Sequence, residues 1–286
     1  MTRTARIAFQ GELGAFSEEA IRNIDAHAEV VPCREFIDVA QAVENGDVDA
    51  GMLPIENTLA GSVVGSYDAL QTCGSLQVVA ETVVEIHHCV MAPHGARLGA
   101  LTMVESHPVA LAQCTRWLRA HPSIVARAAY DTAGAARDVA ARGDVHAAAI
   151  AGRHAAARYD LEILAADIEN RSDNQTRFLM IARDSPPLGH DALARTALLI
   201  TTPNVPGALL RVLEPLARNR INMSKLESRP AEEPWHYRFF LELDHPAGDP
   251  ALDTAIVQLR EATESLRVLG TYTRWRAGRA DDRAPD

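Results

Sequence analysis

The chain has 286 residues, a length that favours two domains over one. Hydrophobic residues make up 47% and charged residues 23%, an ordinary balance for a globular protein, and the net charge of -10 disfavours nucleic acid and anionic membranes as partners. No stretch has the roughly 18 apolar residues of a membrane span, and the amino terminus lacks the apolar core of a secretion signal. We therefore expect a cytoplasmic protein.

The cysteines are scattered and form no C-x-x-C pair, so the sequence predicts neither a zinc site nor a disulfide framework. His87 and His88, next to Cys89, could imitate a metal site. Because no second cluster of ligand residues accompanies them, we interpret these residues as the end of a strand. No metal is predicted.

Strand-like and helix-like segments alternate over the first 182 residues. Short apolar runs predict strands, and apolar residues at helical spacing predict helices. The predicted strands are 6–10, 30–33, 50–55, 76–84, 124–128, 147–151, 161–165 and 177–182, and the predicted helices are 16–24, 36–45, 108–120 and 132–141. This alternation favours an α/β architecture with mainly parallel strands.

A segment rich in proline, glycine and serine at 184–190 is the best boundary in the chain. After it we predict a strand at 197–202, a helix at 207–218, strands at 222–229 and 236–243, a helix at 250–264 and a strand at 266–275. This β-α-β-β-α-β order is the ferredoxin-like pattern. The predicted domains are therefore 1–185 and 195–276, with a linker at 186–194 and a flexible tail at 277–286.

Three segments at the ends of predicted strands carry polar side chains suited to a ligand site. Residues 11–17 join two glycines to a helix start, residues 54–63 gather an acid, an amide and hydroxyls, and residues 170–178 are mostly polar or charged. Each also has an ordinary explanation: structural glycines, a capped turn in which Asn57 or Thr58 begins a helix, and a solvated loop. In the third segment, Asn174, Thr176 and Arg177 could converge on a carboxylate.

Taken together, these segments resemble the prephenate dehydratase family, lyases of phenylalanine biosynthesis. The match spans nearly all of residues 5–183, and it consists of Gly-x-x-Gly-x-Phe-Ser at 11–17, Pro54–Asn57 with Gly61, Ser106-His107-Pro108 with Gln113-Cys114, and Asn-Gln-Thr-Arg-Phe at 174–178. The resemblance implies a two-lobed, periplasmic-binding-protein-like catalytic domain with its site in the cleft. One lobe would hold residues 1–76 and the strand after 176, and the other roughly residues 77–170.

The resemblance also implies the reaction, in which prephenate loses carbon dioxide and water to give phenylpyruvate without a cofactor. We expect Thr176 to donate a hydrogen bond to the leaving oxygen. Glu56 is the alternative proton source, or else an acceptor that orients neighbouring N–H groups. Arg177 would clamp a substrate carboxylate, and Phe178 would line the cleft wall. The remaining polar shell would consist of Ser17, Asn57, Gln113 and Asn174.

The C-terminal unit resembles the regulatory ACT domain of this family. One motif opens its first helix and another closes its second strand. The resemblance implies that L-phenylalanine binds between two ACT domains of a homodimer or homotetramer, with inhibition as the expected effect. Leu209 and Leu210 also have a plain explanation in core packing. The implied phenylalanine-binding residues are Asn204, Gly207, Ala208, Leu209, Leu210, Glu227, Ser228, Arg229 and Pro230.

Two other functions fit the same features. The first is a non-catalytic ligand sensor, since two-lobed binding domains and ACT domains both bind small molecules; the intact Thr176-Arg177-Phe178 argues against it. The second is an arogenate dehydratase, which performs the same chemistry on the transaminated substrate. The sequence alone leaves this second alternative open.

Overall fold

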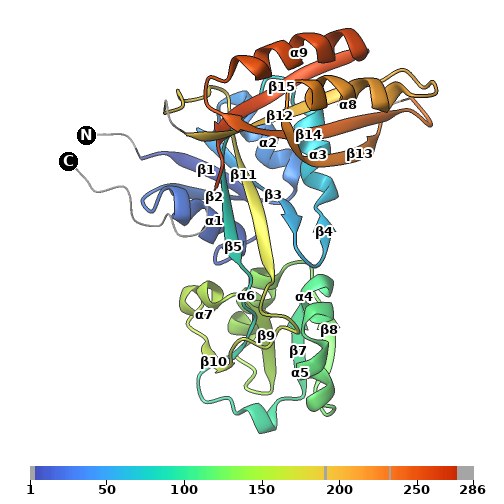
Figure 1. Cartoon of the computed structure of the whole chain (residues 1–286). Helices are drawn as coiled ribbons and strands as arrows, with labels where there is room; N and C mark the ends of the chain where they lie inside the picture. Colours follow the sequence, from blue (N-terminus) through green and yellow to red (C-terminus); the bar gives the residue numbers. More distant parts are fainter. Residues whose placement is uncertain (1–3, 190–191, 232, 276–286) are drawn as a thin grey trace. The chain divides into compact units, whose positions relative to one another are not determined.

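The structure, a computed structural model, describes residues 4–189, 192–231 and 233–275 (Figure 1). The predicted tail at 277–286 lies outside the described residues. The chain separates into two compact units: Met1–Thr72 with Thr82–Leu179, and Cys73–Glu81 with Met180–Asp286. In the described part of the chain, no helix is both long enough and apolar enough to cross a bilayer.

Two lobes, each built on one sheet, make up most of the first unit (Figure 1). Residues 77–81 and 180–182, at the ends of two strands of the first sheet, belong to the second unit. The first sheet has the order β2-β1-β3-β11-β5, with β4 paired to β3. Strand β1 is parallel to both β2 and β3, as the alternation of strands and helices predicted. The elements of this lobe are β1 (Arg6–Gln10), α1 (Phe16–Ile24), β2 (Glu29–Cys33), α2 (Phe36–Asn45), β3 (Ala50–Asn57), β4 (Gly61–Ser62), α3 (Val64–Thr72), β5 (Gln77–Glu85) and β11 (Gln175–Ala182).

The second lobe has the sheet order β10-β6-β9-β7-β8. This sheet is mixed: β7 is parallel to β8 and β9, whereas β6 is antiparallel to β9 and β10. Its core is a cluster of small and branched apolar side chains, including Val90, Val104 and Ile150. The elements are β6 (Cys89–Ala92), β7 (Met103–Ser106), α4 (Pro108–Gln113), α5 (Thr115–Ala120), β8 (Val125–Ala128), α6 (Thr132–Arg142), β9 (Ala147–Ala151), α7 (Arg153–Arg158) and β10 (Glu162–Ala165), with a short 3-10 turn at Leu98–Ala100.

Three sequence-based expectations for this unit are wrong. The lobe boundary is misplaced, because β5 (Gln77–Glu85) belongs to the first sheet and the chain enters the second lobe only after it. The single helix predicted at 108–120 is two helices, which break at Cys114, where φ is -113° and ψ is 21°. Neither Asn57 nor Thr58 starts a helix, because β3 runs through Asn57 and the chain turns back into β4.

The second unit carries the predicted ferredoxin-like pattern. Its sheet is antiparallel, with the order β13-β14-β12-β15. Gly270 on β15 has a φ of +147°, and a Cβ added there would lie 2.1 Å from the backbone oxygen of Val78, so no side chain fits at that position. The elements are β12 (Leu193–Thr201), α8 (Ala208–Arg218), β13 (Asn222–Pro230), β14 (Tyr237–Pro246), α9 (Pro250–Ala262) and β15 (Ser265–Thr273).

Candidate functional site

Four polar side chains from both lobes of the first unit meet where β3 ends and β11 begins. Asn57 donates from Nδ2 to Asn174 Oδ1 at 2.8 Å, to the Gln175 carbonyl at 3.1 Å and to Thr176 Oγ1 at 2.9 Å. From α4 of the second lobe, Gln113 Oε1 accepts from Asn174 Nδ2 at 3.0 Å, and Gln113 Nε2 donates to Asn57 Oδ1 at 3.4 Å. Asn57, Asn174 and Thr176 are all buried. We call Asn57, Gln113, Asn174 and Thr176 the amide cluster.

The direction of every hydrogen bond in the amide cluster follows from two backbone groups. The N–H groups of Leu59 and Ala60 donate to one side-chain atom of Asn57, at 3.0 and 2.8 Å, so that atom is the oxygen. The other atom of Asn57 is therefore the nitrogen, and it must donate to Asn174 Oδ1. The same reasoning makes Asn174 a donor to Gln113. Only one assignment of donors and acceptors therefore fits the whole cluster, with the two Nδ2 hydrogens of Asn57 shared among three acceptors.

This arrangement determines what the Thr176 hydroxyl can do. Its oxygen accepts a hydrogen bond from Asn57 Nδ2. A hydroxyl has one hydrogen to donate in addition to its lone pairs. Within the described part of the chain, that hydrogen makes no bond, so it is available to an acceptor on a bound molecule. The side chain is 8% exposed, and a hydrogen bond in such a poorly solvated place is stronger than one in water.

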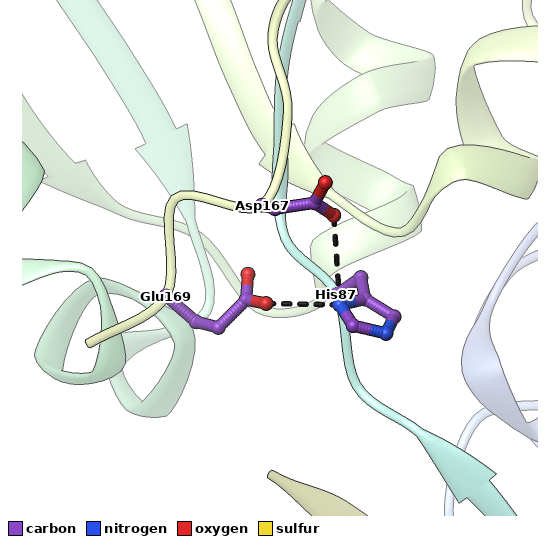
Figure 2. Close-up of side chains that lie close together, drawn as sticks. All are labelled: His87, Asp167 and Glu169. Atoms are coloured by element: carbon purple, nitrogen blue, oxygen red, sulfur yellow. Dashed lines mark hydrogen bonds and ion pairs between the residues drawn. The ribbon is translucent and has the colours of Figure 1, made fainter. Parts of the chain in front are cut away.

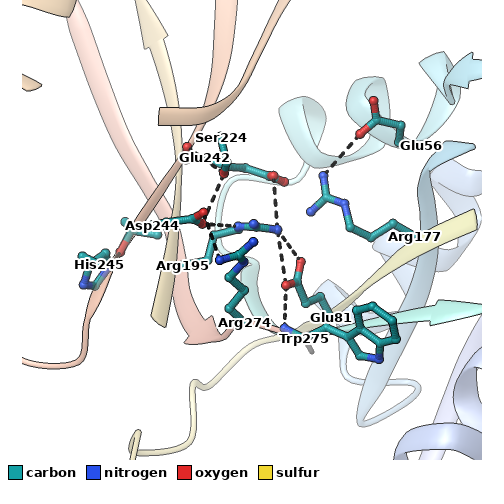
Figure 3. A network of polar contacts seen from close by, with 11 residues as sticks. Glu56, Glu81, Arg177, Arg195, Ser224, Glu242, Asp244, His245, Arg274 and Trp275 are labelled. Carbon is teal, nitrogen blue, oxygen red and sulfur yellow. Dashed lines mark hydrogen bonds and ion pairs between the residues drawn. The ribbon is translucent and has the colours of Figure 1, made fainter. Parts of the chain in front are cut away.

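The structure does not bring Glu56 and Arg177 into the amide cluster. Successive residues of a strand point to opposite faces, so Glu56 and Arg177 lie on the face opposite Asn57 and Thr176. There the two side chains form an ion pair, with Arg177 Nη2 3.6 Å from Glu56 Oε2 (Figure 3). The Arg177 side chain is 15% exposed and the Glu56 side chain 43%. Both residues therefore lie at the strand ends, but on the opposite face of the sheet from Thr176.

The two remaining predicted shell residues are both buried. Ser17 is the second residue of α1 and is 8% exposed, and it makes none of the hydrogen bonds that join the amide cluster. Phe178 follows Thr176 by two positions on β11, hence on the same face, and is 2% exposed. The structure therefore places Phe178 in the core beneath the amide cluster.

The two lobes also touch through residues that the sequence analysis did not single out. Glu12, in the loop after β1, accepts from Tyr130 at 2.9 Å and pairs with Arg137 at 2.6 Å. The Tyr159 hydroxyl donates to the Leu13 carbonyl at 2.7 Å. These partners lie more than 100 residues apart in the chain. Spacing and periodicity act over a few turns of helix or strand, so they carry no signal for such pairs.

His87 meets two acids at the link between the lobes (Figure 2). Its Nδ1 lies 2.9 Å from Glu169 Oε1 and 3.5 Å from Asp167 Oδ1. The hydrogen bond with Glu169 raises the pKa of His87. Burial opposes ionisation of Glu169, but the backbone N–H of His88 and the His87 side chain together lower the pKa of that acid. No second cluster of ligand residues stands near His87 in the sequence, because the two acids lie 80 and 82 residues further along the chain.

The second unit contains a buried charge network around Arg195 (Figure 3). The guanidinium lies 2.9 Å from Glu81 Oε2, 2.7 Å from Asp244 Oδ1 and 3.8 Å from Glu242 Oε2, and all four side chains are at most 9% exposed. The backbone N–H of Trp275 adds a further bond to Glu81 at 2.7 Å. Burial opposes ionisation of Asp244, but its bond to Arg195 keeps the pKa of Asp244 below the ordinary value. Through Glu81, the network connects the short segment at 73–81 to the four-stranded sheet of the second unit.

A hollow of about 280 Å³ lies at the start of α8 in the second unit. It is lined by five of the predicted phenylalanine-binding residues, Asn204 and Gly207–Leu210, together with Trp235 and Tyr237. Gly207 caps the helix with a φ of +78°, in the left-handed region that favours glycine. The other motif, Glu227–Pro230, lies on the edge strand β13 and does not line this hollow.

Comparisons with known proteins give matches over most of the chain. Residues 7–186 match the family model described as prephenate dehydratase, and residues 196–261 match the ACT domain. Arogenate dehydratase/prephenate dehydratase 2, chloroplastic, from Arabidopsis thaliana is 39% identical over 277 residues, covering 93% of this chain and 72% of its own.

Two solved structures are also similar over most of their length. A prephenate dehydratase from Arthrobacter aurescens, in complex with L-Phe, has a TM-score of 0.87 at 30% identity and covers 94% of this chain and 90% of its own. GqqA, described as a novel type of quorum quenching acylase, has a TM-score of 0.86 at 32% identity and covers 94% of this chain and 97% of its own.

Proposed function

Because the chain belongs to the prephenate dehydratase family and carries an ACT domain, we propose that it converts prephenate to phenylpyruvate, with loss of carbon dioxide and water, under control by L-phenylalanine. The dehydratase lyase class follows from the family. The observation that supports the specific chemistry is the Thr176 hydroxyl, which is buried, held by Asn57 and left with an available hydrogen.

The reaction needs help at the leaving oxygen. Prephenate carries a carboxylate on a quaternary ring carbon and a hydroxyl across the ring. When the carboxylate leaves as carbon dioxide, its electron pair enters the ring and the C–O bond breaks, so the ring becomes aromatic. Hydroxide is a poor leaving group, and charge develops on its oxygen as the bond breaks. One preorganised donor to such charge lowers the barrier by about 3–4 kcal/mol.

Thr176 is the proposed donor. A threonine hydroxyl is a very weak acid, so we assign it a hydrogen bond to the leaving oxygen and not full transfer of its proton; the departing hydroxide takes its proton from solvent. Asn57, Gln113 and Asn174 hold it in place through the amide cluster. Ser17 and Arg177 remain proposed substrate contacts. Glu56 remains the alternative proton source, although its pairing with Arg177 on the opposite face favours Thr176.

Related activities differ from this proposal in ways that can be measured. An arogenate dehydratase would use the same donor on a substrate with an amino group in place of the keto oxygen, and one relative carries both names. An acylase needs a nucleophile activated by a neighbouring base. In the described residues, the partner of the Thr176 hydroxyl is the Asn57 amide nitrogen, which donates and cannot accept its proton. This geometry suits a hydrogen-bond donor.

We also propose that L-phenylalanine binds between the ACT domains of two subunits, in a homodimer or homotetramer. The hollow at Gly207 is bordered by exposed apolar side chains, with Leu210 68% exposed and Trp235 83% exposed. The Glu227–Pro230 motif does not line it within one chain, so a second copy is needed to bring both motifs to one ligand. The helix start suits the ligand carboxylate.

The experiment is a turnover assay with purified protein. Phenylpyruvate formation is followed by its absorbance at alkaline pH, and carbon dioxide is measured alongside it. We expect one phenylpyruvate and one carbon dioxide for each prephenate consumed, with a higher kcat/KM for prephenate than for arogenate. A higher kcat/KM for arogenate would reassign the substrate, and no turnover of either would favour the ligand sensor.

Inhibition by L-phenylalanine and the cellular location are two further predictions. L-Phenylalanine is expected to lower the rate in this assay. A cytoplasmic location is expected as well, while the Arabidopsis relative is named chloroplastic. Fractionation of the producing cells would test the location directly.

A further inference from the structure

His88 is a buried side chain to which the sequence analysis gave no role. It lies between β5 and β6, where the chain passes from one lobe to the other, and it is 2% exposed. Its N–H donates to Glu169 at 2.9 Å, and its carbonyl accepts from Ile168 at 3.1 Å. The Phe16 ring packs edge-on against the imidazole, with ring centres 5.8 Å apart. The imidazole is therefore held on several sides.

The imidazole contacts the amide cluster through Gln113. His88 Nε2 lies 2.9 Å from Gln113 Oε1, the same oxygen that accepts from Asn174. Because this atom is an oxygen and can only accept, the hydrogen of that bond belongs to His88 Nε2. The hydrogens of the cluster, fixed by the backbone of residues 59 and 60, therefore also fix the tautomer of His88.

The other nitrogen of the ring is unmatched. In this tautomer Nδ1 is an acceptor, and among the described residues it is buried with no hydrogen-bond partner. Burial lowers the pKa of His88, in keeping with a neutral ring. An unmatched buried acceptor is unfavourable for stability. A phenylalanine would fill nearly the same space without that penalty, so the useful feature of the histidine at this position is its Nε2 donor.

We propose that His88 is a positioning residue for the dehydration, whose Nε2–H holds the Gln113 carboxamide so that the amide cluster keeps the Thr176 hydroxyl hydrogen available to the substrate. The inference rests on the proposed function. Without the His88 donor, Gln113 is held by Asn174 and weakly by Asn57, at 3.4 Å. If the Gln113 carboxamide turns over, its nitrogen faces Asn174 Nδ2, and two donors then oppose each other. The directions of the hydrogen bonds in the amide cluster are then no longer fixed.

The effect should fall on the rate of the chemical step. His88 acts through Gln113, so KM for prephenate should change less than threefold. A small misplacement of a reacting group can lower the rate by about 10²-fold, and we expect His88→Phe to lower kcat about 10- to 100-fold. In His88→Gln, the amide nitrogen stands near the position of Nε2 and restores the donor. We expect its kcat to stay within about fivefold of wild type.

The test compares kcat, KM and melting temperature for wild type, His88→Phe and His88→Gln. His94→Phe is the matched control, since the His94 side chain is 64% exposed and pairs only with exposed Asp160 among the described residues; its kcat should be unchanged. If His88→Phe does not fold, His88→Asn replaces it, because its amide stands at the Nδ1 position and cannot reach Gln113. A double variant, His88→Phe with Gln113→Ala, should lose no more kcat than the worse single variant.

If wild type turns over prephenate, any one of three results would overturn the inference. The first is a wild-type kcat in His88→Phe, or in His88→Asn where that replaces it, and the second is a kcat in His88→Gln as low as in that variant. The third is a loss in the double variant that equals the sum of the two single losses in activation free energy. Absence of turnover in wild type would instead overturn the proposed function. The two failures are therefore distinguishable.

Discussion

Asn57→Asp tests the direction of the hydrogen bonds in the amide cluster. The substitution replaces Nδ2, which donates to three acceptors at 2.8, 3.1 and 2.9 Å, with an oxygen that can only accept. Asn174 Oδ1 and the Gln175 carbonyl cannot reverse their roles. The Thr176 hydroxyl can, and its hydrogen should turn toward the new carboxylate. The substrate then loses its donor, although Thr176 itself is unchanged.

The contacts of Asn57 set the expected size of two effects, the loss of kcat and the loss of folding stability. Loss of one donor to developing charge lowers kcat by about 10²–10³-fold. Two acceptors, on Asn174 and Gln175, are left unmatched beside a buried carboxylate, at about 1–3 kcal/mol each. Burial favours the protonated acid. Once protonated, the introduced carboxyl group can donate again, so activity relative to wild type should recover as the pH is lowered.

The assay is kcat with prephenate at several pH values, together with the melting temperature. Asn219→Asp is the matched control, because Asn219 Nδ2 also donates to two acceptors, at 2.8 and 2.9 Å, in the second unit. It should lower stability and leave kcat unchanged. Wild-type kcat in folded Asn57→Asp at pH 8 would refute the reasoning, as would a loss that acid does not relieve.

Three other variants have definite expected outcomes. Arg177→Lys should raise KM at least about tenfold at nearly unchanged melting temperature, because an ammonium cannot reproduce a planar two-pronged contact with a substrate carboxylate; a lowered melting temperature with KM changed less than threefold would restrict Arg177 to its ion pair with Glu56. Gly207→Val should abolish the calorimetric heat of L-phenylalanine binding, since valine is strained at a φ of +78°; equal affinity would remove the site. Arg195→Met removes the cation that Glu81, Glu242 and Asp244 share, and it should destabilise the protein by about 3–5 kcal/mol in denaturant unfolding. The pKa of Asp244 is lowered in wild type, so the stability that its ionised form contributes is complete above the ordinary aspartate pKa of about 3.9 and is lost as the pH falls through the lowered value. Thermal melts should therefore show that Arg195→Met loses less stability than wild type between pH 5 and pH 3. The same pH dependence in both proteins would contradict this assignment.

Much of the amide cluster could be predicted from the sequence. Asn57 follows one predicted apolar strand and Thr176 directly precedes another. Ligand-binding side chains gather at strand ends of an α/β sheet. The separation of Arg177 from Thr176 was missed because the predicted strand began at residue 177. The structure begins β11 at Gln175, and strand alternation then sends neighbouring side chains to opposite faces.

Other features depend on contacts that no local pattern records. His88 and Gln113 meet only because the link between the lobes passes beside α4. The break at Cys114 interrupts a continuous helical pattern, and this buried thiol packs into the core of the second lobe, where burial raises the pKa of Cys114 to about 12. The edge position of β13 depends on the order of strands in its sheet, which the sequence of elements alone does not give.

The central claim is that the Thr176 hydroxyl assists departure of the ring oxygen. Its most direct test is kcat for prephenate in Thr176→Val, which removes the hydroxyl at nearly constant shape, against Thr176→Ser, which keeps it. Asn57 Nδ2 retains two acceptors in the valine variant, so the fold should survive. We predict a loss of at least about 10²-fold for valine, as expected for one donor to developing charge, and less than about tenfold for serine. Equal kcat in valine variant and wild type would contradict the account and return the role to Glu56.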